Sequence, residues 1–159
     1  VQILNSEVEF ANNWIAKNVS DHSALHHRSC LLRLLFEILK DSKDVNMNGK
    51  ELIVKELKWN EVVIELYPGH EALWCYRRFL FQFSFEIFER SLIPKNWNQI
   101  KKFLDSNFIL WEENALNCLD DIFMAEIDFS LRCAENDSAW DFTVQRHHSL
   151  AYLSFIINI

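Results

Sequence analysis

The sequence predicts an all-α protein, an α-α superhelix of stacked helical hairpins, and three features point to this class. The chain of 159 residues has only two glycines and two prolines, so few positions suit tight turns. Half of the residues are apolar, and they recur at spacings of three and four, as on one face of a helix. A sandwich, barrel or doubly wound sheet needs many more short connections. The length suits one domain over residues 1–159.

Polar or turn-forming stretches divide the chain into segments of helical length. They are marked by N-cap side chains, by glycine, or by a proline that disfavours a helical backbone at the residue before it. The predicted breaks are residues 18–21, the loop 41–49, the Pro68-Gly69 turn, Ile93-Pro94 and residues 135–138. The predicted helices are residues 6–17, 21–40, 50–67, 70–91, 96–105, 107–134 and 137–158. They form hairpins over about residues 6–40, 50–91 and 107–158.

The segment after the Pro68-Gly69 turn is apolar on two sides, so it needs neighbouring helices on both. A stacked array of helical hairpins provides such neighbours. The two apolar stripes are Leu73, Tyr76, Leu80, Phe83 and Ile87, and Trp74, Phe81, Phe85 and Phe88. The chain begins with Val1 and ends on the apolar residues 155–159, so we expect a fragment of a longer protein.

The charge distribution excludes one class of partner and suggests another. A formal net charge of −7 argues against binding nucleic acid, which requires neutralising phosphates. Residues 112–141 contain nine acidic side chains and one basic side chain, Arg132. We interpret this run as a solvated outer face, with a surface for a basic partner as the alternative. The acids expected opposite the apolar face of this segment are Asp120, Asp121, Glu126 and Asp128.

The cysteines and the hydropathy pattern indicate a reducing compartment. Cys30, Cys75, Cys118 and Cys133 match no zinc or redox spacing, so core thiols are favoured over a disulfide framework. No charged and then apolar leader opens the chain, and no apolar run reaches the roughly 20 residues of a membrane span. We therefore expect a cytoplasmic location and no membrane span.

Three segments share a plan of a polar start, a small residue, a large apolar residue, aromatic or His positions and Arg. They are residues 21–28, 70–78 and 136–142, in which Leu25, Trp74 and Trp140 take the equivalent position. This plan resembles the repeat of the protein prenyltransferase α subunits. Residues 136–140 are similar to that family's Asn-x-Ser-Ala-Trp variant, and residues 73–78 to its Trp-His-His-Arg-Arg variant. The long insertions resemble an outlying member rather than the farnesyl or Rab-type subunits.

The resemblance implies an α-type subunit that wraps a zinc-containing β subunit. That β subunit would transfer a geranylgeranyl or farnesyl group to a C-terminal cysteine of a protein substrate, with Mg²⁺ assisting the diphosphate. The family's Lys-Asn-Tyr element before the Trp is missing, since its positions hold residues 20–22, 69–71 and 135–137. No catalytic residue is therefore carried over, and the chain alone is expected to be inactive. The alternative is a non-enzymatic tetratricopeptide-like adaptor, although its 34-residue period is absent.

The signature residues have two interpretations, packing between hairpins or contact with a partner subunit. Packing is favoured, because Trp is a large knob whose N–H needs one partner, and Arg can bind carboxylates of the next repeat. The candidates are His26, His27, Arg28, Trp74, Tyr76, Arg77, Arg78, Asn136 and Trp140. His22 and His26 lie four apart and could reach one zinc, but packing is favoured there too, so no metal ligand is assigned.

Overall fold

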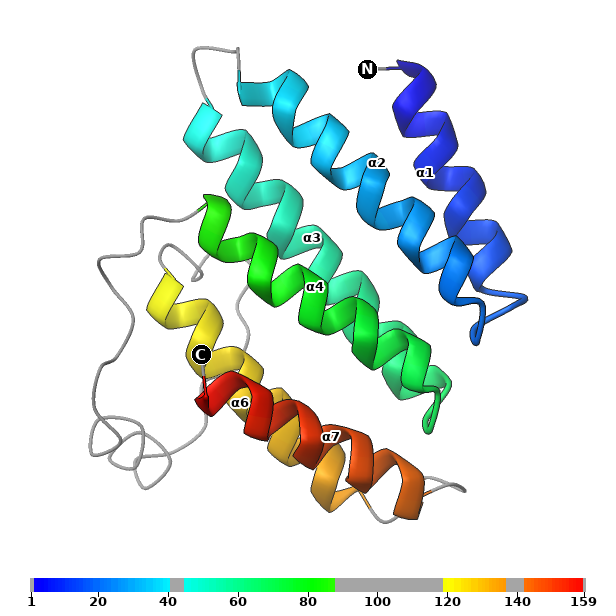
Figure 1. The fold of residues 1–159 in the computed structure, drawn as a ribbon, viewed down its shortest axis with the longest axis vertical. Coiled ribbons are helices and arrows are strands. Elements are labelled where there is room, and N and C mark those ends of the chain that lie inside the picture. The colour runs from blue at the N-terminus through cyan, green and yellow to red at the C-terminus, as the bar shows by residue number, and fades with distance from the viewer. Residues whose placement is uncertain (1, 41–44, 88–118, 137–141, 159) are drawn as a thin grey trace.

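The computed structural model describes residues 2–40, 45–87, 119–136 and 142–158 (Figure 1). Over these residues the chain forms helices and no strand, which confirms the all-α class. The helices are α1 (Gln2–Ile15), α2 (His22–Lys40), α3 (Val45–Leu66), α4 (Glu71–Ile87), α6 (Leu119–Glu135) and α7 (Phe142–Ile157). The predicted helix 96–105, the start of the predicted helix 107–134 and Phe88 lie outside the described residues.

The helices pack as three successive hairpins, with α1 against α2, α3 against α4 and α6 against α7 (Figure 1). The second helix of each hairpin packs against the next hairpin, because α2 contacts both α3 and α4, and α4 contacts α7. The second helices therefore form one continuous layer in the order α2, α4, α7. Within the described residues, no helix has the length and apolar composition needed to cross a membrane.

The first hairpin turns at an N-cap, as the break at residues 18–21 predicted. The Asp21 Oδ1 atom accepts hydrogen bonds from the backbone N–H groups of Ser23 at 2.9 Å and Ala24 at 3.1 Å. Trp14 Nε1 of α1 donates to Asp21 Oδ2 at 2.9 Å, which ties the cap to the preceding helix. The Trp14 bond, and then the bond from Ala24, lower the pKa of the Asp21 carboxyl.

Helix α3 begins inside the predicted loop 41–49, so that prediction was wrong from Val45 onward. Gly49 lies within the helix rather than at a turn. A Cβ atom at Gly49 would lie 2.9 Å from Cε2 of Phe36 and 3.3 Å from Cγ2 of Ile87. The glycine therefore lets side chains of α2 and α4 approach the backbone of α3, and its lack of a side chain serves packing.

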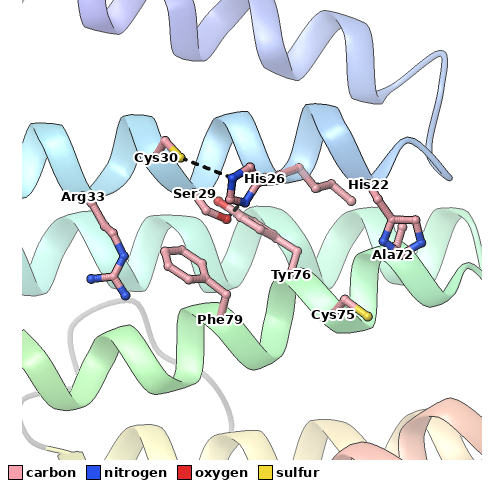
Figure 2. A pocket seen from close by; sticks show the side chains of 10 residues that line it. His22, His26, Ser29, Cys30, Arg33, Ala72, Cys75, Tyr76 and Phe79 are labelled. Atoms are coloured by element: carbon pink, nitrogen blue, oxygen red, sulfur yellow. Dashed lines mark hydrogen bonds between the residues drawn. The ribbon is translucent and has the colours of Figure 1, made fainter.

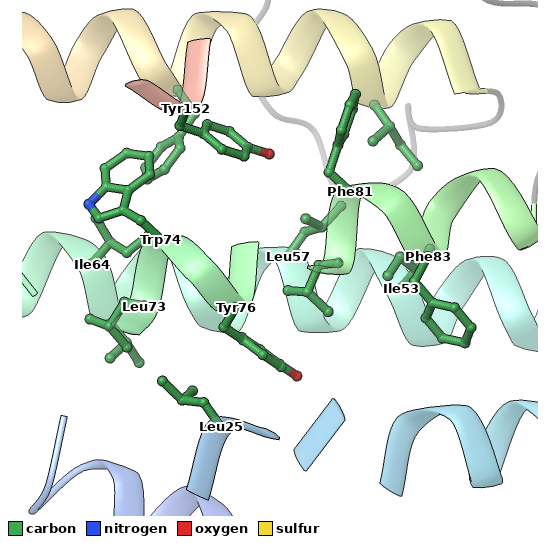
Figure 3. Packing of buried hydrophobic residues seen from close by; sticks show 14 of the residues in the cluster. Leu25, Ile53, Leu57, Ile64, Leu73, Trp74, Tyr76, Phe81, Phe83 and Tyr152 are labelled. Atoms are coloured by element: carbon green, nitrogen blue, oxygen red, sulfur yellow. The ribbon is translucent and has the colours of Figure 1, made fainter. Parts of the chain in front are cut away.

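Helix α4 is buried on two sides, as its two apolar stripes predicted. Trp74 and Phe81 point toward Tyr152 of α7, whereas Leu73 and Tyr76 point toward Leu25 of α2 (Figure 3). Phe85 is only half-buried and is the exception. The buried members of the two stripes are Leu73, Trp74, Tyr76, Leu80, Phe81, Phe83 and Ile87. Helix α4 is thus the central element through which the first and third hairpins share one core.

The Pro68-Gly69 turn between α3 and α4 forms as predicted. Gly69 has a φ of 85°, a left-handed conformation that costs other L-residues free energy. Its backbone N–H donates a hydrogen bond to Gln145 Oε1 of α7 at 2.9 Å. The conformation of this turn therefore also fixes a contact with the third hairpin.

We expect Gly69→Ala to lower the free energy of unfolding by about 1–2 kcal/mol, because alanine is strained at a positive φ. Gly69→Asn is the matched control. It should lower the free energy of unfolding by less, since asparagine tolerates the left-handed region. Urea unfolding followed by circular dichroism measures both variants. Equal midpoints for the alanine variant and the unmodified protein would contradict this assignment.

Candidate functional site

The most distinctive polar feature is a buried ion pair between the second and third hairpins. Arg77 of α4 binds Glu126 of α6 through two hydrogen bonds, Nε to Oε2 at 2.6 Å and Nη2 to Oε1 at 2.7 Å. Both side chains are fully buried. Arg77 Nη1 also donates to Asn60 Oδ1 at 3.1 Å and to the Leu57 carbonyl at 3.3 Å. Tyr152 of α7 donates its hydroxyl to Glu126 Oε2 at 2.6 Å.

The same arrangement joins the first and second hairpins. Arg28 of α2 donates Nε to Glu56 Oε2 at 2.9 Å and Nη2 to Glu56 Oε1 at 2.8 Å. Arg28 Nη1 also donates to Asn12 Oδ1 and, at 3.3 Å, to the Val8 carbonyl. Tyr76 of α4 donates its hydroxyl to Glu56 Oε2 at 3.0 Å. Each carboxylate is therefore held by an arginine of the preceding hairpin and a tyrosine of its own.

An aromatic ring lies against each guanidinium group. This ring belongs to the residue three positions after the glutamate in the sequence. The Arg28 Cζ atom is 4.0 Å from the Trp59 ring centroid, and the Arg77 Cζ atom is 3.8 Å from that of Phe129. Such a cation–π contact is more favourable where water is excluded. We call the repeated unit the Arg–Glu clasp. Its members are Arg28, Glu56, Trp59 and Tyr76 in the first copy and Arg77, Glu126, Phe129 and Tyr152 in the second.

The electrostatics of the clasp keep its arginine charged and its tyrosine protonated. Burial by itself lowers the pKa of Arg77, but the Glu126 carboxylate outweighs that effect, so the pKa is raised. Burial, and then the neighbouring carboxylates, raise the pKa values of Tyr76 and Tyr152 well above their ordinary value. Both tyrosines therefore remain hydrogen-bond donors to the glutamates at neutral pH.

The signature tryptophan lies between hairpins, where the packing interpretation placed it. Trp74 is 1% exposed and stacks on Phe129 with ring centroids 5.7 Å apart. Its indole Nε1 donates to Gln145 Oε1 at 3.3 Å, which supplies the single partner that a buried indole needs. Leu25, at the equivalent position of the first hairpin, is also buried.

The remaining signature residues are less buried than the packing interpretation expected. His26 and His27 are both exposed, so that interpretation was wrong for them. His27 lies at the surface beside α1, where its Nε2 atom is 3.8 Å from Oε2 of Glu7 and both side chains are about half exposed.

The last signature candidates lie toward the third hairpin. Arg78 is half-buried, and its Cζ atom lies 5.8 Å from the Phe155 ring centroid. Asn136 is exposed directly after α6. Trp140 lies outside the described residues. The α7 residue that donates to the clasp glutamate is Tyr152, which lies beyond the predicted third signature of residues 136–142.

The glutamates of the clasp were missed by sequence reasoning. Glu126 was expected on an outer face but is fully buried, because Arg77 neutralises it inside the core. Arg132, the single base in the acidic run, is also paired, with Asp128 at 2.9 Å and Glu61 at 2.9 Å. In the sequence, Glu56 and Glu126 are each followed three residues later by an aromatic residue, but Glu7 and Glu71 share this spacing, so it does not distinguish the clasp glutamates.

The thiols differ in exposure, so the expectation of core thiols holds for only some of them. Cys133 is buried, and burial raises the pKa of its thiol to about 12. Cys75 is half-buried, whereas Cys30 is exposed, which contradicts a core role there. All three are free thiols, and Cys118 lies outside the described residues.

The described residues do not assemble a metal site. No group of three His, Cys, Asp or Glu side chains is placed to hold an ion within the described parts of the chain. His22 and His26 are exposed on α2 and do not fit a zinc site by themselves.

Ser20 Oγ and His70 Nδ1 form a hydrogen bond of 2.7 Å that joins the two loops preceding α2 and α4.

Comparison with known families identifies the repeat. The family model described as protein prenyltransferase alpha subunit repeat matches residues 4–35 and 53–84. These ranges cover most of the first hairpin and much of the second, including both clasp arginines. The first two hairpins therefore each contain a protein prenyltransferase alpha subunit repeat. In the third hairpin, Glu126 and Tyr152 form the same clasp that Glu56 and Tyr76 form in the second.

Each curated relative is similar to about half of the chain. The chain is 34% identical over 109 residues to protein prenyltransferase alpha subunit repeat-containing protein 1-B of Xenopus laevis, covering 52% of this chain and 25% of that protein. It is 29% identical over 108 residues to the repeat-containing protein 1 of Homo sapiens, covering 51% and 27%.

A further relative is the geranylgeranyl transferase type-2 subunit alpha of Schizosaccharomyces pombe. It is 27% identical over 78 residues, covering 49% of this chain and 23% of that subunit. The chain thus spans about a quarter of the length of the curated relatives it matches. No solved structure matches the chain.

We expect Arg77→Met to lower the free energy of unfolding by about 3–5 kcal/mol, because it leaves Glu126 buried without its cation. Adding Glu126→Leu to this variant should recover most of the loss, since a buried ion pair can be replaced by apolar side chains at little net cost. Urea unfolding of both single variants and the double variant gives the coupling free energy.

Arg33→Met is the matched control for the clasp. Arg33 also binds its partner, Glu86, through two hydrogen bonds of 2.9 and 3.0 Å, but both side chains are about half exposed. Removal of this ion pair should lower the free energy of unfolding by less than about 1 kcal/mol, because water screens an exposed pair. Equal losses for the Arg33 and Arg77 variants would show that burial of the clasp has no energetic consequence.

We also expect the free energy of unfolding to fall above pH 9. The Cys133 thiol has a pKa of about 12 in the folded protein against an ordinary value of 9.0, so the unfolded chain loses this proton first. The contribution of this thiol to the free energy of unfolding is fully present below pH 9. Between pH 9 and pH 12 it falls by at most about 1.4 kcal/mol per pH unit. Cys133→Ala should reduce the decline without removing it, because Tyr76 and Tyr152 also have raised pKa values in the folded protein, whereas Cys30→Ala should leave the decline unchanged. Equal slopes for the two cysteine variants would contradict the assignment.

Proposed function

We propose that this chain is part of the α-type subunit of a heterodimeric protein prenyltransferase in the cytoplasm. Its β partner holds the zinc and transfers a geranylgeranyl or farnesyl group to C-terminal cysteines of protein substrates, with Mg²⁺ assisting the diphosphate. The geranylgeranyl group is preferred, because one similar protein is named a geranylgeranyl transferase subunit. The chain's own role is to scaffold the partner and to help select the protein substrate.

The observation that carries this proposal is the repeat itself, in sequence and in geometry. Two copies match the family repeat, and the clasp fixes how successive hairpins stack. A rigid stack presents its surface to a partner in one shape, because the buried ion pairs allow one register between hairpins. No residue of this chain is assigned to catalysis.

A non-enzymatic adaptor is the second candidate, and one observation favours it. The Xenopus laevis and Homo sapiens relatives are named only as repeat-containing proteins, whereas the fission yeast relative is named as a transferase subunit. The family's Lys-Asn-Tyr element is also missing before Leu25 and before Trp74. An adaptor would use the same stacked hairpins to bind proteins without contributing to prenyl transfer.

We expect the full-length parent protein to co-purify one-to-one with a prenyltransferase β subunit when the two are co-expressed. The pair should transfer a prenyl group to a protein ending in a cysteine motif, and the chain alone should not. Co-purification followed by size-exclusion chromatography measures the complex, and mass spectrometry of the substrate measures the transfer.

The control for this experiment is Arg77→Met, which disturbs the stacking of the hairpins without changing their exposed surfaces. It should reduce recovery of the complex, and the double variant with Glu126→Leu should restore it. Failure to bind every prenyltransferase β subunit tested would reject the enzyme proposal and leave the adaptor.

A further inference from the structure

The equivalence of the repeats shows which face of each hairpin receives the preceding one. Arg28 of α2 and Arg77 of α4 take the same position in the clasp, so a residue of α2 corresponds to the residue 49 positions later in α4. On α4, Tyr76 and Phe79 point toward α2 of the preceding hairpin (Figure 2). The corresponding side of α2 therefore faces away from the second hairpin.

Apolar side chains on that side of α2 are exposed where their counterparts in α4 are buried. Phe83 of α4 is 1% exposed and packs edge-on against Phe36 of α2, with ring centroids 5.5 Å apart. Its counterpart in α2, Leu34, is 49% exposed. Ile38 is 41% exposed, whereas its counterpart Ile87 is 9% exposed. This side of α2 thus carries the apolar residues of a helix interface, and they are left about half exposed among the described residues.

Helices α1 and α3 are equivalent in the same way. Arg28 Nη1 donates to Asn12 of α1, just as the arginine of the second clasp donates to Asn60 of α3. A residue of α1 therefore corresponds to the residue 48 positions later in α3, and Ala11 takes the position of Trp59. The Trp59 ring lies against Arg28 of the preceding hairpin. The position of Ala11 thus belongs to the same outward face as Leu34 and Ile38.

A pocket with a volume of about 320 Å³ lies on this face between α1 and α2. Two alanines line it, Ala11 and Ala24, and they correspond to Trp59 of α3 and Leu73 of α4. The Trp14 ring also lines the pocket, and its indole N–H is already hydrogen-bonded to the cap of α2 at 2.9 Å. The pocket is therefore largely apolar, and it is open where the second hairpin carries larger side chains.

The signature residue of each second helix packs at the corresponding position of the next hairpin. Leu25 of α2 lies opposite Leu73 of α4 (Figure 3). Trp74 of α4 stacks on Phe129 with ring centroids 5.7 Å apart, and its ring centroid lies 5.5 Å from that of Tyr152. By equivalence, the pocket between α1 and α2 is the position that receives a signature residue on the first hairpin.

The size of the signature residue is matched to the residues that it meets. Where the signature residue is leucine, the next hairpin has the large pair Trp59 and Leu73. Where it is Trp74, the next hairpin has Phe129 and, at the position of Leu73, the smaller Ser149. A core without voids sets large side chains opposite small ones. The two alanines of the first hairpin therefore require the larger signature residue, tryptophan.

We propose that a further helical hairpin of the full-length protein covers the outward face of the first hairpin, with the signature tryptophan of its second helix in the pocket between α1 and α2. That helix packs along α2 as α2 packs along α4, and its apolar stripe covers Leu34 and Ile38. This contact does not involve a β subunit, so it is independent of the proposed function.

The protein's own chain suits this role better than a second copy of the described hairpins. In both described contacts between hairpins, the covering helix belongs to the hairpin that precedes in the same chain. The matched part covers only 25% and 27% of two repeat-containing relatives, so those proteins have the length for further hairpins. A second copy would offer α7, in which Leu150 takes the position of Trp74 relative to the clasp tyrosine. Leucine would leave the pocket partly empty.

The test places the photo-cross-linking residue p-benzoylphenylalanine at Phe10 of the full-length protein. Phe10 lines the pocket and is 63% exposed among the described residues. After irradiation, we expect mass spectrometry to find a cross-link to a tryptophan-containing peptide from outside residues 1–159. An equal mixture of isotopically labelled and unlabelled protein should give this cross-link only within single molecules.

The same cross-linking residue at Val62 is the matched control. Val62 is 52% exposed, but it lies on α3 and does not line the pocket. It should not give the cross-link expected from the position of Phe10.

A second variant fills the pocket. Ala24→Trp should displace the tryptophan of the covering helix and lower the yield of the Phe10 cross-link by about tenfold or more, because a filled core position does not accept a second large side chain. Ala16→Trp is its control, since Ala16 is exposed directly after α1 and does not line the pocket. It should change the yield by less than about twofold. Circular dichroism checks that each variant is folded.

Three results would overturn the proposal. One is the absence of a cross-link from the position of Phe10 to any peptide outside residues 1–159, or an equal yield of that cross-link from Val62. Another is a cross-link between labelled and unlabelled molecules, which would show that a second copy covers the face. The third is an equal yield for Ala24→Trp and Ala16→Trp. Because the experiment contains no β subunit, each of these results leaves the test of the prenyltransferase proposal unaffected.

Discussion

The structure depends on the burial of two arginine–glutamate pairs between hairpins. A buried charge is stable only when it is paired and its remaining hydrogen-bonding atoms are satisfied. Arg77 meets this condition by using atoms of α3 and α6 together with an aromatic ring of α6. Because those groups converge only when the second and third hairpins are in register, the ion pair specifies the stacking. The apolar core alone would tolerate small displacements of one hairpin against another.

The first and last described helices, α1 and α7, each lack one member of the clasp. Asn12 of α1 corresponds to Asn60 of α3. Glu56 lies four residues before Asn60, but Val8 lies four residues before Asn12, so α1 has no glutamate at the corresponding position. Tyr152 of α7 corresponds to Tyr76 of α4. Arg77 follows Tyr76, but Leu153 follows Tyr152, so α7 has no arginine at the corresponding position. Within the described residues, the outer faces of α1 and α7 therefore offer apolar contacts where the inner hairpins form ion pairs. Exposed side chains such as Phe10 and Trp14 on α1 agree with this difference.

The sequence was sufficient to predict what periodicity and local capping control. The two apolar stripes of α4, the cap at Asp21 and the turn at Gly69 are each marked by residues that lie close together in the sequence. The burial of Glu126 could not be predicted that way, because its cation lies 49 residues away on another helix. Periodicity placed Glu126 outside only because an acid is normally solvated. Gly49 was misjudged for a similar reason, since the side chains that need its space come from α2 and α4.

The burial of these arginines bears directly on what the repeats can do. Arg28 and Arg77 are at most 1% exposed, and each already binds a carboxylate, so neither is free to neutralise a diphosphate. The signature Arg that might suggest phosphate chemistry is, in these two repeats, an internal support. The layer of second helices does carry polar groups that face solvent, among them His22, His26 and Arg33 of α2. The buried pairs therefore act on function through the shape of the surface that the stacked hairpins present, and not through direct contact of these two arginines with a ligand.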